Sequence, residues 1–396
     1  MVFSGETIVR RTHSLDVTLT NQEFFSTEDD RMISFNNYTA HDGRELAELV
    51  ARKALQPAEL VAAALEAVEQ VTPKRRGPVQ RIAIGITIVI GLVALGVPVD
   101  AQSWQPPADN QRCPSKWGAG DERGAANHMN PETVLRATRL IKSGEVIELA
   151  HVLSPSIPLV GTRRFDVHTK RTFMNQASNR RGSNEEILIS EMGQVGTQFD
   201  GFAHQTLADK VYNCFKVDEI ASRGGFTKLG IEKVGALITR GVLIDVAGLK
   251  GVDILPDTYE ITVQDLEGAL QRQNLQLQPG DAVIIHTGWG KLWGKDNARY
   301  GKSCPGIGVQ AAEWLAKQDP MLVGSDNWPV EVLPNPDPQV SAPVHQILLV
   351  VNGIYLLENL KLEELAAKRV HEFAFIMQPL KMQGFSGSTV APIAVR

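Results

Sequence analysis

The chain has 396 residues and a formal net charge of −5, with 40 Lys and Arg residues against 45 Asp and Glu residues. This acidic balance argues against a nucleic-acid-binding protein. Hydrophobic residues make up 43% and charged residues 21%, which is typical of a globular protein and excludes collagen-like, coiled-coil and wholly disordered chains. Cys113, Cys214 and Cys304 lie far apart without Cys-x-x-Cys spacing, so they predict no thiolate zinc site and allow at most one disulfide.

The first part of the chain predicts two short amphipathic helices within residues 42–73, where apolar residues recur at helical spacing and Pro57 opens the second helix. This stretch resembles the N-terminal helices of the amidase-signature family. The Ser- and Gly-rich amidase core with its catalytic lysine has no counterpart later in the chain. We therefore interpret residues 1–73 as an extension that arose from a gene fusion or a start-site artefact.

Residues 74–101 resemble a secretory signal peptide. The segment from Ile82 to Val97 has no charged residue, follows a basic stretch, and is shorter than the roughly 20 residues that a membrane-spanning helix needs. Val99 and Ala101 are small residues at the two positions that a signal peptidase reads. This predicts a periplasmic or secreted protein. The alternative is a genuine helical extension with an internal membrane anchor at residues 82–97.

The body of the chain, residues 102–396, alternates between the two kinds of secondary structure. β-branched apolar runs predict strands at 146–153, 187–189, 237–246, 282–286, 321–324, 347–357 and 373–377. Helical spacing predicts helices at 131–142, 263–273, 309–317 and 361–368, with Asn130 and Thr262 as N-caps. The body is therefore expected to form a single mixed α/β domain.

The densest group of potential ligands lies between Gln194 and His204. In an extended segment residues two apart share a face, so Gln194, Gln198, Asp200 and His204 can project to one side, with Gly196 leaving room between them. Two amide oxygens, one carboxylate and one imidazole suit a divalent cation. Compared with an all-imidazole zinc site, this oxygen-rich ligand set favours harder ions such as Mn²⁺ somewhat more. The alternative from the spacing alone is a solvated polar face.

This group resembles the signature of the metal-dependent cyclase superfamily, His-x-Gly-Thr-His-x-Asp-x-Pro-x-His, which is found in kynurenine formamidases, isatin hydrolases and trans-dienelactone hydrolases. Glutamine stands at both metal-site histidines, in a version similar to a branch associated with lactone hydrolysis, and Phe202 replaces the proline. Four further ordered blocks are similar to the family: 117–127 (WGAGDERGAAN), 280–289 (GDAVIIHTGW), 323–327 (VGSDN) and 345–360 (HQILL…GI…ENL).

The resemblance implies a fold, a cofactor and a set of site residues. The fold is the swivelling β/β/α domain, commonly in dimers or tetramers. The cofactor is a divalent metal, Mn or Zn, which activates water and polarises a carbonyl. Gln194, Gln198 and Asp200 match the metal ligands, and His204 is a general base or an additional ligand. His345 and Glu358 match a late pair that forms a proton relay or completes a second metal site.

A run of basic residues precedes the motif: Arg163, Arg164, Lys170, Arg171, Arg180 and Arg181. A solvated loop is the simplest interpretation of this polar stretch. Because the whole chain is acidic, a local positive charge near the site could instead steer a carboxylate-bearing small-molecule substrate. His286, at the end of a predicted strand, is expected to be a structural histidine.

These observations favour a metal-dependent hydrolase that opens a cyclic ester or amide, of the lactonase or formamidase type. One alternative is a non-catalytic metal- or small-ligand-binding protein, in which the glutamines have removed efficient catalysis. Another is a serine hydrolase of the amidase type, suggested by residues 42–73, whose activity would not respond to chelators.

Overall fold

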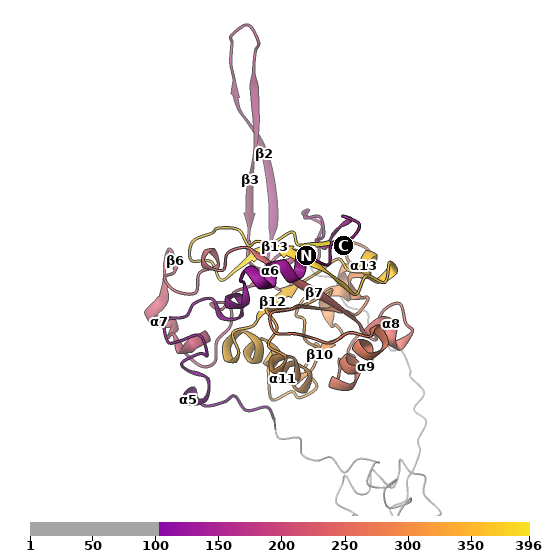
Figure 1. The fold of residues 1–396 in the computed structure, drawn as a ribbon. Coiled ribbons are helices and arrows are strands. Elements are labelled where there is room, and N and C mark those ends of the chain that lie inside the picture. Colours follow the sequence, from indigo (N-terminus) through magenta and orange to yellow (C-terminus); the bar gives the residue numbers. More distant parts are fainter. Residues whose placement is uncertain (1–102) are drawn as a thin grey trace, which may run out of the picture. The chain divides into compact units, whose positions relative to one another are not determined.

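A nine-stranded sheet forms the centre of the fold in the computed structural model, which describes residues 103–396 except the side chains of 172–174 (Figure 1). In sheet order its strands are β1 (Val146–Glu148), β15 (Ile393–Val395), β13 (Glu372–Met377), β7 (Leu237–Asp245), β9 (Ala282–His286), β11 (Leu322–Ser325), β12 (Tyr355–Glu358), β4 (Gln198–Asp200) and β14 (Gly387–Thr389). The four central strands β7, β9, β11 and β12 are parallel, and the flanking pairs are antiparallel. The predictions for residues 1–73 and 74–101 lie outside the described residues.

Helices surround this sheet. The α-helices are α5 (Asp109–Arg112), α6 (Pro131–Thr138), α7 (Val217–Ile220), α8 (Val246–Lys250), α9 (Val263–Gln273), α10 (Asn297–Lys302), α11 (Val309–Lys317), α12 (Pro343–His345) and α13 (Glu363–Ala367). Single turns of 3₁₀-helix lie at η1 (Gly124–His128), η2 (Tyr212–Cys214), η3 (Ile231–Lys233) and η4 (Trp289–Leu292). The predicted caps are confirmed, since the side chains of Asn130 and Thr262 accept the N–H groups of Thr133 and Asp265.

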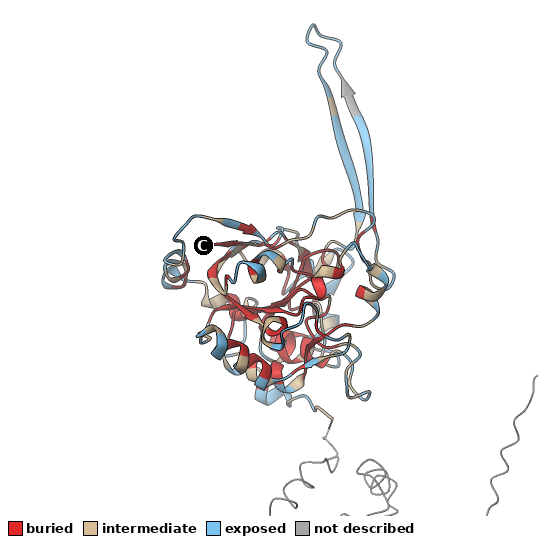
Figure 2. Cartoon of the chain, turned by 90° about the vertical axis from the view of Figure 1, so that its right-hand side faces the viewer, coloured by how far each residue is buried: buried red, intermediate tan, exposed pale blue. Residues whose placement is uncertain are grey.

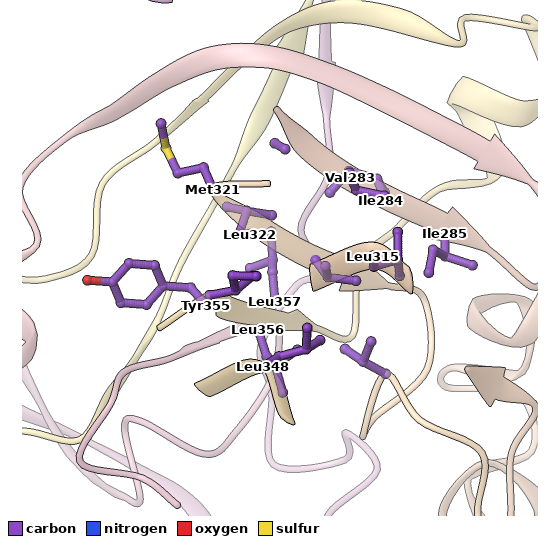
Figure 3. Packing of buried hydrophobic residues seen from close by; sticks show 14 of the residues in the cluster. Val283, Ile284, Ile285, Leu315, Met321, Leu322, Leu348, Tyr355, Leu356 and Leu357 are labelled. Carbon is purple, nitrogen blue, oxygen red and sulfur yellow. The ribbon is translucent and has the colours of Figure 1, made fainter. Parts of the chain in front are cut away.

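The core lies against both faces of the central strands. Val283, Ile284 and Ile285 of β9 are all buried, as expected for a parallel strand that is covered on both faces. Figure 3 shows these side chains gathered with Leu315 of α11 and Leu348. The predicted mixed α/β class is therefore confirmed for the described residues.

One predicted element is wrong in part. Residues 347–357 were expected to form one strand, but Gln346–Val351 form a π-helix (η5), and strand β12 begins only at Tyr355. A short, fully buried apolar run fits a helix as well as a strand, because burial on every side removes the periodicity that separates them. Gly353, at a φ of +61°, turns the chain from the helix into the strand.

The most prominent feature outside the body is a hairpin of β2 (Phe165–Met174) and β3 (Gly182–Ser190), which projects from the domain (Figures 1 and 2). Most of its described residues are exposed, whereas Phe165 at its base is buried. The expected solvated loop is therefore wrong for most of this stretch. Cross-strand pairs such as Lys170 with Glu185, whose charged atoms lie 3.7 Å apart, hold polar strands together. Near its base the hairpin exposes Val167, Ile187, Leu188 and Ile189.

Two smaller pairings complete the described strands: β5 (Ala221–Ser222) with β6 (Gly225–Phe226), and β8 (Glu260–Ile261) with β10 (Gly306–Ile307). A disulfide joins Cys113 to Cys214 across 101 residues, and Cys304 is a buried free thiol. Within residues 103–396, none of the helices combines the length and apolar character required to cross a bilayer.

Candidate metal and catalytic site

The site is built where the short strand β4 pairs with the end of β12. Gln198 and Asp200 lie two residues apart on β4 and therefore share a face, as predicted. The register places Glu358, the last residue of β12, opposite Gln198. The Gln198 Nε2 group donates to Glu358 Oε2 at 2.6 Å, so a strand pairing between segments 160 residues apart brings the amide and the carboxylate together.

The motif is not one extended segment, which corrects the geometry expected from the sequence. Gln194 and His204 lie in turns on either side of β4, closed by the hydrogen bonds Gln194 N to Glu191 O and His204 N to Gly201 O. Gly196 has a φ of +70°, and a Cβ there would lie 2.1 Å from the Leu153 side chain, so only glycine fits this turn.

The two turns still bring the motif side chains together. Gln194 Nε2 lies 3.1 Å from His204 Nδ1 and 3.3 Å from Asp200 Oδ1, and His204 Nε2 lies 4.0 Å from Asp200 Oδ2. Gln194, Asp200 and His204 therefore lie together, although turns rather than strand parity place Gln194 and His204. Gln198 contacts Glu358 instead.

His345 enters this cluster from α12. Its Nε2 atom lies 3.3 Å from Glu358 Oε1 and 3.8 Å from Asp200 Oδ2. Its Nδ1 atom hydrogen-bonds to Glu331 Oε1. The predicted late pair is thus in direct contact, and it lies beside the motif.

Glu331 is the site residue that sequence reasoning missed. It is almost fully buried and also accepts the backbone N–H groups of Val344 and His345, at 3.2 and 3.4 Å. It therefore fixes both the main chain and the ring of His345, and directs Nε2 toward Asp200. The signal that could have found it is a lone carboxylate in the apolar run after the Gly-Ser-Asp-Asn block, because a buried carboxylate needs a partner.

Three side chains converge as a cation would require. Asp200, His204 and His345 each offer one ligand atom, and these atoms all lie within 4.8 Å of one another. Asp200 Oδ2 and Gln198 Oε1 are buried and have no hydrogen-bond partner among the described residues. Two oxygen atoms without hydrogen-bond partners thus lie near the imidazoles of His204 and His345, and Glu331 orients the ring of His345. This set of donors fits a divalent metal ion.

The two glutamines have defined amide orientations. The Arg163 Nη2 group donates to Gln194 Oε1 at 3.1 Å, and since a guanidinium can only donate, the amide nitrogen of Gln194 must face Asp200 and His204. The nitrogen of Gln198 faces Glu358. The role of both glutamines as metal ligands remains a prediction, and the Oε1 atom of Gln198 is the amide oxygen left without a partner.

Burial and charge shift the pKa values of the three proton-carrying groups. Burial lowers the pKa of His204, and the charge of Asp200 only partly offsets it. Burial also disfavours charge on His345, but its hydrogen bonds to Glu331 and Glu358 outweigh this and raise its pKa well above the ordinary value. Burial, reinforced by the charge of Asp200, raises the pKa of Glu358 to about 7. The site thus combines a neutral imidazole with groups that can hold protons near neutral pH.

A cavity of about 250 Å³ opens onto these groups. Its polar lining comprises Arg163, Gln194, His204, Gln205, Glu331, His345 and Glu358, and its other walls comprise Trp328, Pro329, Leu333 and Ala342. Of the basic run singled out in the sequence, only Arg163 lines this cavity. Lys170 and Arg171 lie on β2 in the projecting hairpin, and Arg164 is exposed.

His286 lies outside this cluster, at the end of β9. Its Nδ1 atom bonds to Asp245 Oδ1 at 2.7 Å, and Asp245 in turn caps α8 by accepting the N–H of Gly248. This pair links the ends of two parallel strands to a helix, which agrees with the expected structural role of His286.

Comparison with known proteins identifies the family. Residues 147–332 match the family Cyclase. The crystal structure of a protein described as a novel cyclase shares 34% sequence identity with the chain, with a TM-score of 0.64, over 71% of this chain and 98% of that one. The chain belongs to the cyclase family. The family suspected from the sequence is therefore confirmed.

Structures of two isatin hydrolases are similar at lower sequence identity. Isatin hydrolase A from Ralstonia solanacearum is 22% identical, with a TM-score of 0.47, over 64% of this chain and 92% of that one. An isatin hydrolase bound to the product analogue thioisatinate is 21% identical, with a TM-score of 0.47, over 67% and 98%. A comparison with curated proteins gave no match.

Proposed function

We propose that this cyclase-family chain is a metal-dependent hydrolase that uses activated water to open a cyclic ester or amide. The observation that carries the proposal is the convergence of Asp200, His204 and His345, with the buried Asp200 Oδ2 atom left without a partner, at the wall of a cavity. Membership of the cyclase family supports it. Clusters of this kind in a concave site are the usual setting of hydrolytic chemistry.

Asp200 and His345 would hold the cation, with the Oε1 atom of Gln198 as a further donor. His204 and Glu358 would lie beside the cation and remain free for proton transfer. A bound Mn²⁺ or Zn²⁺ would lower the pKa of water and polarise a carbonyl oxygen. The hard oxygen donors suit Mn²⁺ and the imidazole suits both metals, so either ion is compatible with this set.

Side chains of the protein would carry out the proton transfers. His204, which burial keeps neutral, can take a proton from the attacking water. Glu358 lines the cavity and can deliver a proton to the leaving oxygen or nitrogen from its Oε1 atom, which also contacts His345. Glu331 holds His345 in one orientation throughout.

The test is hydrolysis of a panel of lactones and cyclic amides by the purified full chain, before and after chelation. We expect turnover that is lost with chelator and restored by Mn²⁺ or Zn²⁺. The variant His204→Ala should lose roughly 10²–10⁴-fold, the range for a general base, whereas His168→Ala on the exposed hairpin should not. Turnover that ignores chelators would favour the amidase-type alternative, and metal binding without turnover would favour the non-catalytic one.

We further propose that the chain works in an oxidising compartment, as the signal-like segment predicts. The Cys113–Cys214 disulfide supports this, because such bonds form and persist outside the reducing cytosol. Cell fractionation tests the location. Recovery in the cytosol with three free thiols would contradict it.

A further inference from the structure

Asn359 is a buried polar residue that directly follows Glu358 at the end of β12. Its backbone has a φ of +55°, in the left-handed region where asparagine is found several times more often than most residues. The chain bends at this residue, so it leaves the strand immediately after the site carboxylate.

The amide of Asn359 joins segments that lie far apart in the sequence. Its Nδ2 group donates to the backbone oxygen of Gly196 at 2.8 Å, and its Oδ1 atom accepts the hydroxyl of Tyr300 at 2.7 Å. Because the Gly196 carbonyl can only accept, the amide has one possible orientation. The backbone oxygen of Asn359 also accepts the Thr197 hydroxyl at 2.6 Å. Asn359 is thus bonded to both residues that precede Gln198, across 163 and 162 positions of the chain.

These bonds lie beside the contact that places the site amide. Gln198 and Glu358 face each other between β4 and β12, and Gln198 Nε2 donates to Glu358 Oε2. Strand β4 has three residues, so its pairings with β12 and β14 are equally short. A slip of one residue would turn Gln198 and Asp200 to the opposite face of the sheet. The bonds from Asn359 to the two residues before β4 oppose such a slip.

We propose that Asn359 is a positioning residue for the metal site, because it locks the register of β4. In this register Gln198 turns its amide nitrogen to Glu358 and leaves its Oε1 atom for the cation. Asp200 Oδ2, on the same face of β4, is the second oxygen atom that the register presents. The role rests on the proposed metal-dependent function, and it adds a residue that lies outside the ligand set.

Asn213 provides a matched control. It is also buried, its φ is +56°, and its side chain likewise bonds to backbone groups. Its partners lie within residues 115–121, which do not line the site cavity. Replacing either asparagine by glycine keeps the left-handed conformation accessible and removes only the side-chain amide. Both variants should therefore lose stability, whereas only Asn359→Gly should disturb the metal site.

The test is a titration of Co²⁺ into the full chain after bound metal has been removed with a chelator. The visible absorption of Co²⁺ reports the ligands around the ion. We expect Asn359→Gly to bind Co²⁺ 10- to 100-fold more weakly, the usual range for a group that orients metal ligands, and to change the shape of the absorption bands. Tyr300→Phe removes the hydroxyl that Asn359 accepts and should act in the same direction by a smaller factor. Asn213→Gly should unfold at lower urea concentration and yet bind Co²⁺ as the wild type does, with unchanged bands.

Unchanged affinity and bands in folded Asn359→Gly would overturn the proposal. An equal loss of affinity in Asn213→Gly would also overturn it, since the effect would then come from general stability. If Asn359→Gly does not fold, Tyr300→Phe decides the question through the same two measurements. A wild type that binds no Co²⁺ would refute the metal site and the role of Asn359 with it, whereas a wild type and an Asn359→Gly variant that bind equally would refute the positioning role alone.

Discussion

Replacing Glu331 by glutamine tests whether this carboxylate orients the metal-site histidine. Glu331 accepts the ring N–H of His345 and the backbone N–H groups of Val344 and His345. A glutamine has one amide oxygen in place of two carboxylate oxygens, so at least one of these buried N–H groups loses its acceptor. That loss costs about 1–3 kcal/mol of unfolding free energy.

The same change should weaken cation binding. Removing the group that orients a metal-ligating histidine costs typically 10- to 100-fold in affinity, or about 1.4–2.8 kcal/mol. We expect Glu331→Gln to fold, to unfold at lower urea concentration, and to bind Mn²⁺ or Zn²⁺ 10- to 100-fold more weakly in competition titrations.

Asp281→Asn is the matched control for this experiment. Asp281 is also fully buried, but it is bound to Arg240, away from the site. The control should lose stability and keep its cation affinity. If Glu331→Gln binds the cation as tightly as the wild type, or if both variants weaken binding equally, the assigned role of Glu331 is wrong.

Three further predictions concern the rest of the fold. Reducing the Cys113–Cys214 disulfide releases a loop of 101 residues, which should lower the unfolding free energy by roughly 4–5 kcal/mol in denaturant titrations with and without reductant; an unchanged midpoint would contradict this. Burial disfavours charge on His286, but its hydrogen bond to Asp245 and the nearby charges of Asp326, Asp245 and Glu363 together outweigh burial and raise its pKa. The stabilisation is therefore complete below the unfolded pKa of about 6.5 and is lost as pH rises through the folded value. The stability gap between wild type and His286→Asn should therefore be wider at pH 6 than at pH 9, and a constant gap would refute the pairing. Light scattering should show a dimer or tetramer, because the hairpin exposes apolar side chains on both faces, and Leu188→Lys should shift the mass toward the monomer if copies cover this hairpin.

The parts of the fold that could be predicted are those whose sequence pattern is local. Thr262 and Asp265 form a capping box that marks the start of α9, and the apolar run of β9 marks a strand buried on both faces. The run at 347–351 has no such pattern, because nearly all of its residues are buried, and it packs against α11 in the folded protein. The apolar run at 187–189 correctly predicted part of β3, but β2 was missed because it is mostly polar and relies on pairing with β3 rather than on a core.

The site residues likewise fall into those that local spacing predicts and those that only the tertiary fold brings together. Gln198 and Asp200 share a face because they are neighbours on one strand, which spacing alone predicts. His345 and Glu358 needed the family resemblance, since only the tertiary fold brings them to the motif. Glu331 is part of no motif, and its role follows from a contact with a residue 14 positions away.

The most direct test of the central claim is the metal content of the purified full chain by elemental mass spectrometry, beside Asp200→Ala and the control Asp257→Ala, at a half-buried residue that is paired with Arg299. We predict near-stoichiometric Mn or Zn in the wild type and in Asp257→Ala, and its loss in Asp200→Ala. Absence of metal from all three proteins, or unchanged metal in Asp200→Ala, would contradict the proposed metal site.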